Sequence, residues 1–159
     1  MIYSFLLILS TLFGPPTKQL VQVVSLEQLQ AKTIQPNNDS LYVVNFWATW
    51  CKPCVGELPY FEKAGGKFAD KKVKIVLVSL DFLSQKEKVD QFVEKNTIQN
   101  EVCLLQAGDP NVWINTIDNN WSGSIPATAI YKNGKKVFFR EGDFSTQQEL
   151  DSVIQTNLK

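Results

Sequence analysis

The chain has 159 residues, of which 44% are hydrophobic and 20% are charged. This is enough apolar material for one domain with a packed core, and it excludes a wholly disordered polypeptide. Sixteen Lys and Arg residues balance sixteen Asp and Glu residues, so the basic stripe of a nucleic-acid-binding protein is missing. The chain has no histidine and only three cysteines, which excludes Ser-His and Cys-His catalytic pairs, histidine-based zinc sites and a disulfide-rich scaffold.

The chain begins with an apolar stretch, residues 2–13, that carries no charge. It is shorter than the roughly 20 apolar residues of a membrane-spanning helix, and it is typical of the apolar region of a secretory signal, although a basic N-terminal region and a small-x-small cleavage site are missing. We therefore expect residues 1–16 to form a leader that exports the protein or tethers it to a membrane, and residues 17–159 to form the folded domain. A buried N-terminal strand or helix is the alternative.

The next part of the chain alternates between strand and helix patterns. A short apolar run at 20–24 precedes a short helix, which Ser25 and Gln28 open as a capping box. Residues 41–47 are apolar except at one position and predict a buried strand. A helix is expected to follow over about 52–69.

The same alternation continues to the C-terminus. Residues 73–80 predict a second buried strand, and Ser84 with Glu87 predicts another capping box, at the start of a helix that ends near residue 95. The mixed charges of residues 81–90 indicate an exposed helix face. The remaining elements are a strand at 101–105, a helix opened by Asp109 and Pro110, a hairpin of residues 127–132 and 135–140 around Asn133-Gly134, and a helix at 145–158.

This order of elements predicts an α/β fold. Alternating strands and helices indicate a central sheet with parallel strands and helices on both faces. The final hairpin adds antiparallel pairing, so the sheet is mixed. Ligands of such sheets bind beyond the carboxyl ends of the strands. The end of the strand at 41–47 is therefore the place to look for a site, and two of the three cysteines follow it.

The segment Cys51-Lys52-Pro53-Cys54 places two thiols in the first turn of a predicted helix. Unpaired N–H groups at the helix start and the neighbouring Lys52 favour a thiolate at Cys51, and the thiolate is the form that attacks disulfides. Cys54 lies deeper and is expected to resolve the mixed disulfide, while Pro53 stiffens the turn. Zinc binding lacks ligands here, and a purely structural disulfide gains little stability from so short a loop. The spacing therefore indicates a redox-active pair.

The segment FWATWCKPC resembles the thioredoxin superfamily, and the longer FWATWCKPCVGELP resembles its extracytoplasmic TlpA/ResA-like branch of thiol-disulfide oxidoreductases. The resemblance covers residues 20–159 and implies a thioredoxin-like fold, with a mixed central sheet flanked by helices. It also implies a cis-proline at Ile125-Pro126, opposite Cys51. The stretch between Cys54 and Pro126 holds one more strand–helix pair than the minimal fold, an insertion typical of this branch.

Glu57 follows Cys54 by three residues and matches the glutamate in the C-x-x-C-x-x-E pattern of ResA-like proteins. Cytosolic thioredoxins usually carry an aspartate where this chain has Asn45, which cannot take a proton at neutral pH. Glu57 is therefore the candidate catalytic carboxyl that assists deprotonation of Cys54, as a buried group with a raised pKa. A solvated or N-terminal-turn carboxylate that merely favours the helix dipole is the alternative. Pro59 is expected to kink the helix, as in many relatives.

The resemblance implies a reductase for disulfides of exported proteins, apocytochrome c among them, supplied with electrons by a membrane-linked donor. The redox group is the disulfide of the two motif cysteines itself, and no other cofactor and no metal are expected. An oxidising or isomerising exchanger, a peroxidase and a non-catalytic binding or chaperone module remain alternatives. The residues expected to contact a client protein are Trp50, Lys52, Pro53, Ile125 and Pro126.

Four further residues have structural explanations from the sequence. Cys103 lies in an apolar strand and is expected to behave as a small buried hydrophobe, with a regulatory or third redox thiol as the alternative. Trp47 is expected in the core. Trp113 and Trp121 are expected to pack or to fasten loops, with a substrate groove as the alternative for Trp121.

Overall fold

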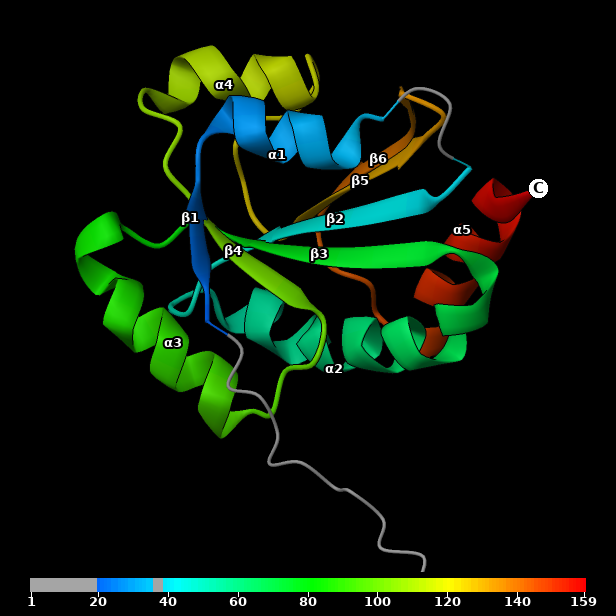
Figure 1. The fold of residues 1–159 in the computed structure, drawn as a ribbon, viewed down its shortest axis with the longest axis horizontal. Coiled ribbons are helices and arrows are strands. Elements are labelled where there is room, and N and C mark those ends of the chain that lie inside the picture. The colour runs from blue at the N-terminus through cyan, green and yellow to red at the C-terminus, as the bar shows by residue number, and fades with distance from the viewer. Residues whose placement is uncertain (1–19, 36–38) are drawn as a thin grey trace, which may run out of the picture.

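The computed structural model describes residues 20–35 and 39–159, so the leader predicted at residues 1–16 lies outside the described residues. Strands and helices alternate along the chain as predicted (Figure 1). The elements are β1 (Gln22–Val24), α1 (Leu26–Thr33), β2 (Leu41–Trp47), α2 (Lys52–Lys67), β3 (Val73–Ser79), α3 (Lys86–Lys95), β4 (Glu101–Leu105), α4 (Pro110–Ile117), β5 (Ala127–Lys132), β6 (Lys135–Glu141) and α5 (Gln147–Leu158), with 3-10 turns at Ala69–Lys71 and Leu83–Gln85.

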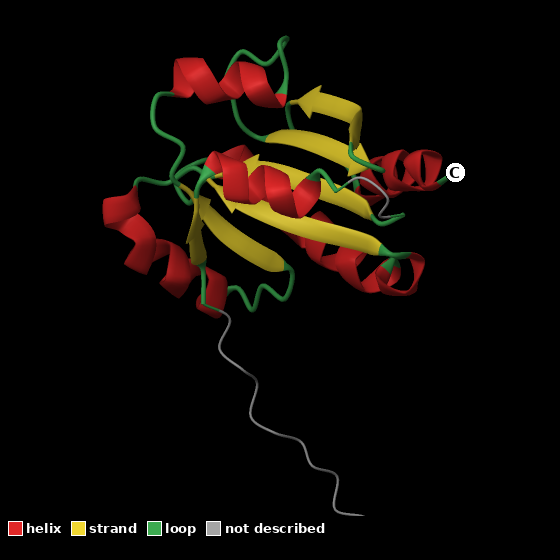
Figure 2. Ribbon diagram, turned by 45° about the horizontal axis from the view of Figure 1, so that its top comes forward, coloured by secondary structure: helices red, strands yellow, loops and turns green. Residues whose placement is uncertain are grey.

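Six strands form one mixed sheet in the order β1-β4-β3-β2-β5-β6. The first four strands in that order are parallel, whereas β5 and β6 pair antiparallel. Parallel neighbours need crossover connections, and their helices cover both faces: α1 and α4 lie on one face and α2, α3 and α5 on the other (Figures 1 and 2). The predicted α/β fold is confirmed. The pairs β3–α3 and β4–α4 both lie between α2 and Pro126, so the predicted extra strand–helix pair is present.

Two apolar cores, one on each face of the sheet, hold the fold together. β2 contributes to both, because all 7 of its residues are buried and successive side chains of a strand point to opposite faces. Leu41, Val43 and Trp47 belong to the cluster formed with α2, α3 and α5. Val44 and Phe46 belong to the cluster formed with α1 and α4. The strand that leads to the motif cysteines is therefore held from both faces.

The β5–β6 hairpin brings a distant segment to the end of β2. Its turn is at Asn133-Gly134, as predicted, and both residues have positive φ, 50° and 75°, the conformation that a type I′ turn requires. β5 pairs with β2 so that Ala127 lies opposite Phe46. Pro126, which directly precedes β5, is thereby placed beside the loop that follows β2.

Capping boxes were predicted at two helix starts, and one of the two predictions is wrong. Ser25 caps α1 as expected: its Oγ accepts the N–H of Gln28, whose side chain accepts the N–H of Ser25. At Ser84 the prediction fails, because residues 83–85 form a 3-10 turn that continues directly into α3 and leaves its start without a side-chain cap. An N-cap residue needs extended backbone, and the extended residue here is Phe82.

The helix that carries the motif cysteines, α2, has 16 residues, contains Pro59 and ends at Lys67. It passes through Gly65, where a neighbouring loop approaches closely. Asn100 Nδ2 donates to the carbonyl oxygen of Phe61 at 3.0 Å, and a Cβ on Gly65 would collide with the Asn100 side chain. The absence of a side chain at Gly65 therefore lets the loop that carries Asn100 pack closely against α2. Among the described residues, no helix is long and apolar enough to cross a membrane.

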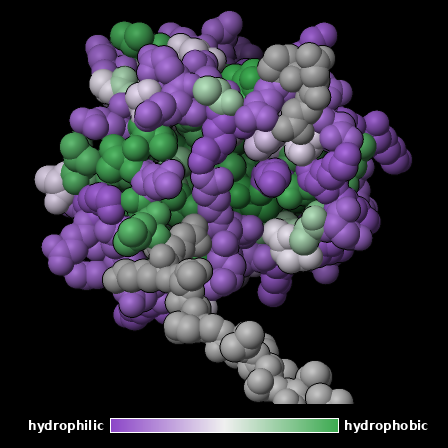
Figure 3. All heavy atoms as spheres, viewed as in Figure 1, coloured by the Kyte–Doolittle hydropathy of each residue, from purple (hydrophilic) through white to green (hydrophobic). Residues whose placement is uncertain are grey.

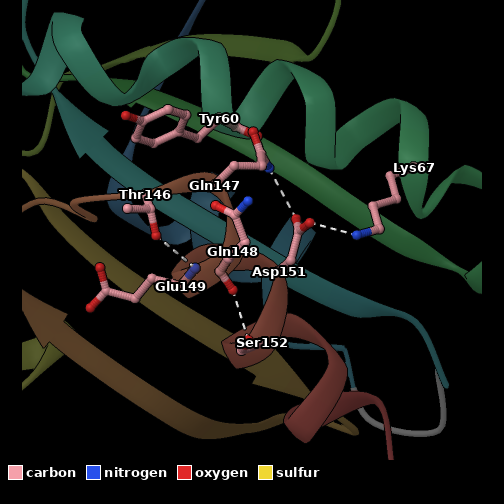
Figure 4. A network of polar contacts seen from close by, with 8 residues as sticks. All are labelled: Tyr60, Lys67, Thr146, Gln147, Gln148, Glu149, Asp151 and Ser152. Atoms are coloured by element: carbon pink, nitrogen blue, oxygen red, sulfur yellow. Dashed lines mark hydrogen bonds and ion pairs between the residues drawn. The ribbon is translucent and has the colours of Figure 1, made fainter.

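A polar network fastens α5 to α2 (Figure 4). Lys67 Nζ forms an ion pair with Asp151 at 2.6 Å. Gln147 Nε2 donates to the carbonyl oxygen of Tyr60 at 3.1 Å and to Asp151 Oδ1 at 3.0 Å. These contacts fix the start of α5, and with it the preceding segment, whose Phe144 N–H reaches the site described below.

Candidate redox site

A disulfide joins Cys51 and Cys54 at the start of α2, with an S–S distance of 1.99 Å and a Cα–Cα distance of 5.3 Å. Cys51 is the N-cap residue, and the N–H of Cys54 donates to Cys51 Sγ at 3.3 Å. Cys51 is 6% exposed and Cys54 is fully buried. The two sulfurs are thus unequal, since Cys51 retains access to the surface and Cys54 faces the core.

The turn between β2 and α2 positions Cys51. The N–H of Cys51 donates to the carbonyl oxygen of Ala48 at 3.1 Å. Lys52 and Pro53 occupy the first two positions of α2 and are exposed, and the first turn carries no acidic residue. Trp50 is 60% exposed beside Cys51. A positive helix end whose first turn carries no acid favours a thiolate at the N-cap.

The segment before β5 faces the more accessible sulfur. The Ile125–Pro126 peptide bond is cis, as the resemblance implies. The carbonyl oxygen of Ile125 lies 3.7 Å from Cys51 Sγ. Ile125 is half-buried and Pro126 is buried. A backbone carbonyl and a proline therefore border Cys51 on the β5 side of the sheet.

Glu57 is a buried residue of α2, with 1% of its surface exposed. Its Oε1 accepts a hydrogen bond from Asn45 Nδ2, and its Oε2 accepts one from the N–H of Phe144, both at 2.8 Å. Burial raises the pKa of Glu57 from 4.5 to about 7, and the charge of Asp143 adds to the rise, while the two hydrogen bonds and Arg140 oppose it. Glu57 is therefore buried, as one expectation had it, and the alternative of a solvated or N-terminal-turn carboxylate is wrong, because the first turn of α2 carries no acidic residue.

Asn45 links this carboxyl to the sheet. Its Nδ2 also donates to Thr128 Oγ1 on β5 at 3.1 Å, and its Oδ1 is buried without a hydrogen-bond partner among the described residues. Because Glu57 follows Cys54 by three residues on one helix, the two side chains share a face of α2. The carboxyl that titrates near neutral pH and the buried sulfur are therefore neighbours.

Asp81 was missed by the sequence analysis, which placed it on an exposed helix face. It lies between β3 and the 3-10 turn and is 2% exposed. Its carboxylate accepts the N–H of Thr49 at 2.9 Å, the hydroxyl of Thr49 at 2.6 Å and the hydroxyl of Ser79 at 2.8 Å. The signal available in the sequence was its position, since a polar residue directly after a buried strand lies at the edge where such sheets bind ligands.

The other singled-out side chains have packing roles, as predicted. Trp47, Trp113 and Trp121 are buried, and Trp121 Nε1 donates to the carbonyl oxygen of Ser124 at 2.8 Å. Cys103 is 1% exposed, and burial raises the pKa of its thiol to about 12. In the described part of the chain, no three His, Cys, Asp or Glu side chains gather where they could hold a metal ion.

Known proteins are similar to this chain in sequence. The chain is 38% identical over 82 residues to the thiol-disulfide oxidoreductase ResA of Oceanobacillus iheyensis, a match that covers 50% of this chain and 41% of the relative. It is 33% identical over 115 residues to ResA of Bacillus thuringiensis, covering 70% of this chain and 60% of the relative. The chain thus spans about half the length of these curated relatives.

The fold also matches solved structures. A secreted Mycobacterium tuberculosis disulfide oxidoreductase homologous to E. coli DsbE superposes with a TM-score of 0.56 at 21% identity, over 77% of this chain and 84% of that one. At this identity the likeness shows the fold, and the predicted thioredoxin-like architecture is confirmed. The model of the AhpC/TSA family matches residues 17–138, more than half of the chain. The chain therefore belongs to the AhpC/TSA family of thioredoxin-like proteins.

Proposed function

We propose that this protein is a thiol-disulfide oxidoreductase, which reduces disulfides of exported proteins through Cys51 and Cys54. The observation that carries the proposal is the inequality of the two sulfurs: Cys51 is 6% exposed and has the carbonyl oxygen of Ile125 3.7 Å from its Sγ, whereas Cys54 is fully buried. A two-thiol exchange needs this arrangement, because one thiol must reach the client disulfide and the other must react only with the mixed disulfide.

The reaction begins with the reduced protein. The Cys51 thiolate attacks one sulfur of a client disulfide, a bond forms between the two proteins, and the other client sulfur leaves as a thiolate. Cys54 then attacks Cys51 Sγ, which expels the second client thiolate and closes the Cys51–Cys54 disulfide. Two electrons pass to the client, and the enzyme pair is oxidised.

Glu57 is proposed to handle the proton of the resolving step. Cys54 attacks only as a thiolate, so its proton must leave first. A carboxyl with a pKa of about 7 is ionised in a large fraction of molecules at neutral pH and accepts a proton readily. Glu57 is the nearest candidate by position, three residues along α2, and Asn45 holds its Oε1.

Client binding is proposed to use the exposed surface around Cys51. Ile125 presents its carbonyl oxygen at this point, so an extended client segment can pair with the backbone ahead of Pro126, as in strand addition. Trp50, Lys52 and Pro53, which adjoin Cys51 in the sequence, are exposed. Pairing through backbone groups does not require a particular client side chain at the paired positions, which suits a protein with several clients.

The compartment and the electron source are part of the same proposal. We propose that residues 1–16 act as an export or tethering leader and that residues 17–159 form the domain. The apolar, uncharged stretch at 2–13 supports this, as does a relative described as secreted. A reductase in an oxidising compartment needs a membrane-linked donor to reduce its disulfide again. Mass spectrometry of the protein recovered from cell fractions tests the leader.

The first test is the reduction potential of the Cys51–Cys54 pair, measured by equilibration in dithiol and glutathione buffers with tryptophan fluorescence as the signal. A value near or below about −270 mV supports a reductase. A value near about −120 mV makes the protein an oxidant instead. A pair that does not cycle reversibly leaves only a binding module.

Single-cysteine variants test the two roles. Cys51→Ser is expected to abolish turnover, and Cys54→Ser is expected to trap client proteins as mixed disulfides, visible on non-reducing gels. Steady-state turnover by Cys54→Ser would contradict the two-thiol scheme. Hydrogen peroxide serves as the control substrate, because rapid consumption by the reduced protein would support a peroxidase instead.

A further inference from the structure

Exposed apolar side chains gather at the end of the sheet that carries the disulfide. Six large hydrophobic residues are exposed among the described residues, and four of them follow β2, β3 or β4 at their carboxyl ends: Trp50, Phe82, Leu83 and Val112. Phe82 is 75% exposed and Val112 is 69% exposed. Apolar surface is visible on the left of the molecule, between α4 and α3, where the arrowhead of β3 points (Figures 1 and 3).

A cavity of about 300 Å³ opens in this surface, between the loop after β3 and the loop after β4. Its apolar walls include Leu80, Phe82, Leu83, Leu105 and Trp113. This volume is at the lower end of the range for small-ligand pockets, about 300–1,000 Å³, so it suits one or two large side chains. Both loops border the extra strand–helix pair, so the insertion builds the cavity.

The cavity wall is joined directly to the turn that carries Cys51. The N–H of Leu80 donates to the carbonyl oxygen of Trp47 at 2.8 Å. Asp81, also in the wall, accepts both the N–H and the hydroxyl of Thr49. Thr49 is two residues from Cys51, so their Cα atoms are at most about 7.6 Å apart. The cavity therefore lies within a few residues of the reacting sulfur. Because β3 and β5 flank β2 on opposite sides, the loop after β3 and the segment before β5 that holds Ile125 also lie on opposite sides of the end of β2.

The charge of the wall restricts the occupant. The one charged side chain among the lining residues is Asp81, and three donors from Thr49 and Ser79 already satisfy its carboxylate. The Asp81 carboxylate would repel an acidic client residue. An apolar client side chain would be stabilised, because it would bury apolar surface against the cavity and the flanking Phe82 and Leu83.

Resting on the proposed thiol-disulfide exchange, we propose that this cavity, here called the β3–β4 pocket, binds a large apolar side chain of the client close to its reacting cysteine. A client segment would pair with Ile125, cross Cys51 and place this side chain in the pocket. At about 3.3 Å per extended residue, the side chain belongs two to four residues from the client cysteine. The preferred substrates are unfolded segments with an aromatic or large aliphatic residue at that spacing.

The test compares two synthetic peptides that each carry one cysteine disulfide-linked to glutathione. One peptide has phenylalanine two to four residues from the cysteine on either side, and the other has serine there. The reduced protein is expected to prefer the phenylalanine peptide in kcat/KM by about 10-fold, the smaller end of the discrimination that apolar pockets achieve. In Phe82→Ser and Leu83→Ser this ratio should fall towards one, mainly through KM.

Val137→Ser is the matched control, because Val137 is an exposed hydrophobic residue of β6, 45% exposed and remote in sequence from the pocket loops. It should keep the wild-type ratio. A ratio near one in the wild type, or an unchanged ratio in Phe82→Ser and Leu83→Ser, would overturn the proposal. So would a dimer of the wild type that Phe82→Ser converts to a monomer in sedimentation, because the face would then bind a second copy.

A binding measurement separates this proposal from the proposed activity. The affinities of both peptides, with cysteine replaced by alanine, are measured for a Cys51→Ser/Cys54→Ser variant by tryptophan fluorescence, since Trp113 lines the pocket. Tighter binding of the phenylalanine peptide supports the pocket even if the protein reduces no disulfide. Equal affinities overturn the pocket even if turnover is normal.

Discussion

Glu57 and Asp81 are both buried carboxyl groups attached to the segment that carries the disulfide, yet their surroundings differ. Asp81 accepts three hydrogen bonds, two of them from Thr49 in the turn before Cys51. Glu57 accepts two, one on each oxygen, and its pKa is raised to about 7. Burial is similar, at 2% and 1% exposure. The comparison teaches that two carboxyls of similar burial can have different partners: hydrogen bonds from Thr49 and Ser79 join Asp81 to the turn before Cys51, whereas burial raises the pKa of Glu57 against its two hydrogen bonds.

The largest effect is expected from removing the better-satisfied group. Asp81→Ala leaves the N–H and hydroxyl of Thr49 and the hydroxyl of Ser79 without their acceptor. Removing one partner of a buried charged network costs about 3–5 kcal/mol, so we expect the free energy of unfolding to fall by about 4 kcal/mol in urea titrations of the disulfide-bonded protein.

Asp39→Ala is the matched control for Asp81→Ala. Asp39 forms an ion pair with Lys72 at 2.5 Å, and its side chain is 71% exposed. A surface pair of this kind contributes little to stability, because solvent screens the two charges. Equal effects of the two substitutions would show that Asp81 does not fasten the turn.

The second effect concerns Glu57 and depends on pH. The folded protein holds the Glu57 proton more tightly than the unfolded chain, because the pKa is about 7 when folded against 4.5 ordinarily. This group therefore reduces stability as pH rises from 4.5 to 7, by about 3 kcal/mol in total. Glu57→Gln should remove that loss, so its stability relative to wild type should rise by about 3 kcal/mol between pH 4.5 and 8. A difference in the free energy of unfolding between Glu57→Gln and wild type that stays the same at all pH values would contradict the raised pKa.

A smaller effect is expected from a second carboxyl beside Glu57. Asn45→Asp replaces the amide that donates to Glu57 Oε1 at 2.8 Å with a carboxyl, and two carboxyls at this distance cannot both ionise without repulsion. We expect little change at pH 5, where one shared proton joins them, and a loss of about 2 kcal/mol at pH 8. The measurement is thermal unfolding at both pH values, and a loss of equal size at pH 5 would point to packing instead.

The smallest effect is expected outside both regions, at Cys103. Its thiol is buried on β4, with a pKa raised to about 12, so it stays protonated and unreactive. Cys103→Val should change stability by less than about 1.5 kcal/mol and leave disulfide turnover unchanged. Alkylation of Cys103 in the folded protein at pH 8, detected by mass spectrometry, would contradict this expectation.

Much of the fold could be predicted because its signals are local. The buried strands at 41–47 and 73–79, the Ser25 cap and the Asn133-Gly134 turn each depend on residues within a few positions of one another. The local signal failed at Ser84, where the chain enters α3 through a 3-10 turn. No cap pattern predicts which of two helical geometries the preceding residues adopt, since both satisfy the same backbone groups.

The sequence by itself determined the alternation of strands and helices, the position of the cysteine pair at a strand-to-helix junction and the burial of Cys103. Periodicity, caps and the spacing of two thiols act over a few residues, so the sequence is sufficient for them.

Only the tertiary structure decided which distant groups meet at the cysteines. Ile125 is 74 residues from Cys51, and Phe144 is 87 residues from Glu57. The hydrogen bonds from Thr49 to Asp81 and the β3–β4 pocket likewise depend on the strand order β4-β3-β2. Strand order and helix packing follow from the burial of two whole cores, and no local pattern carries that information.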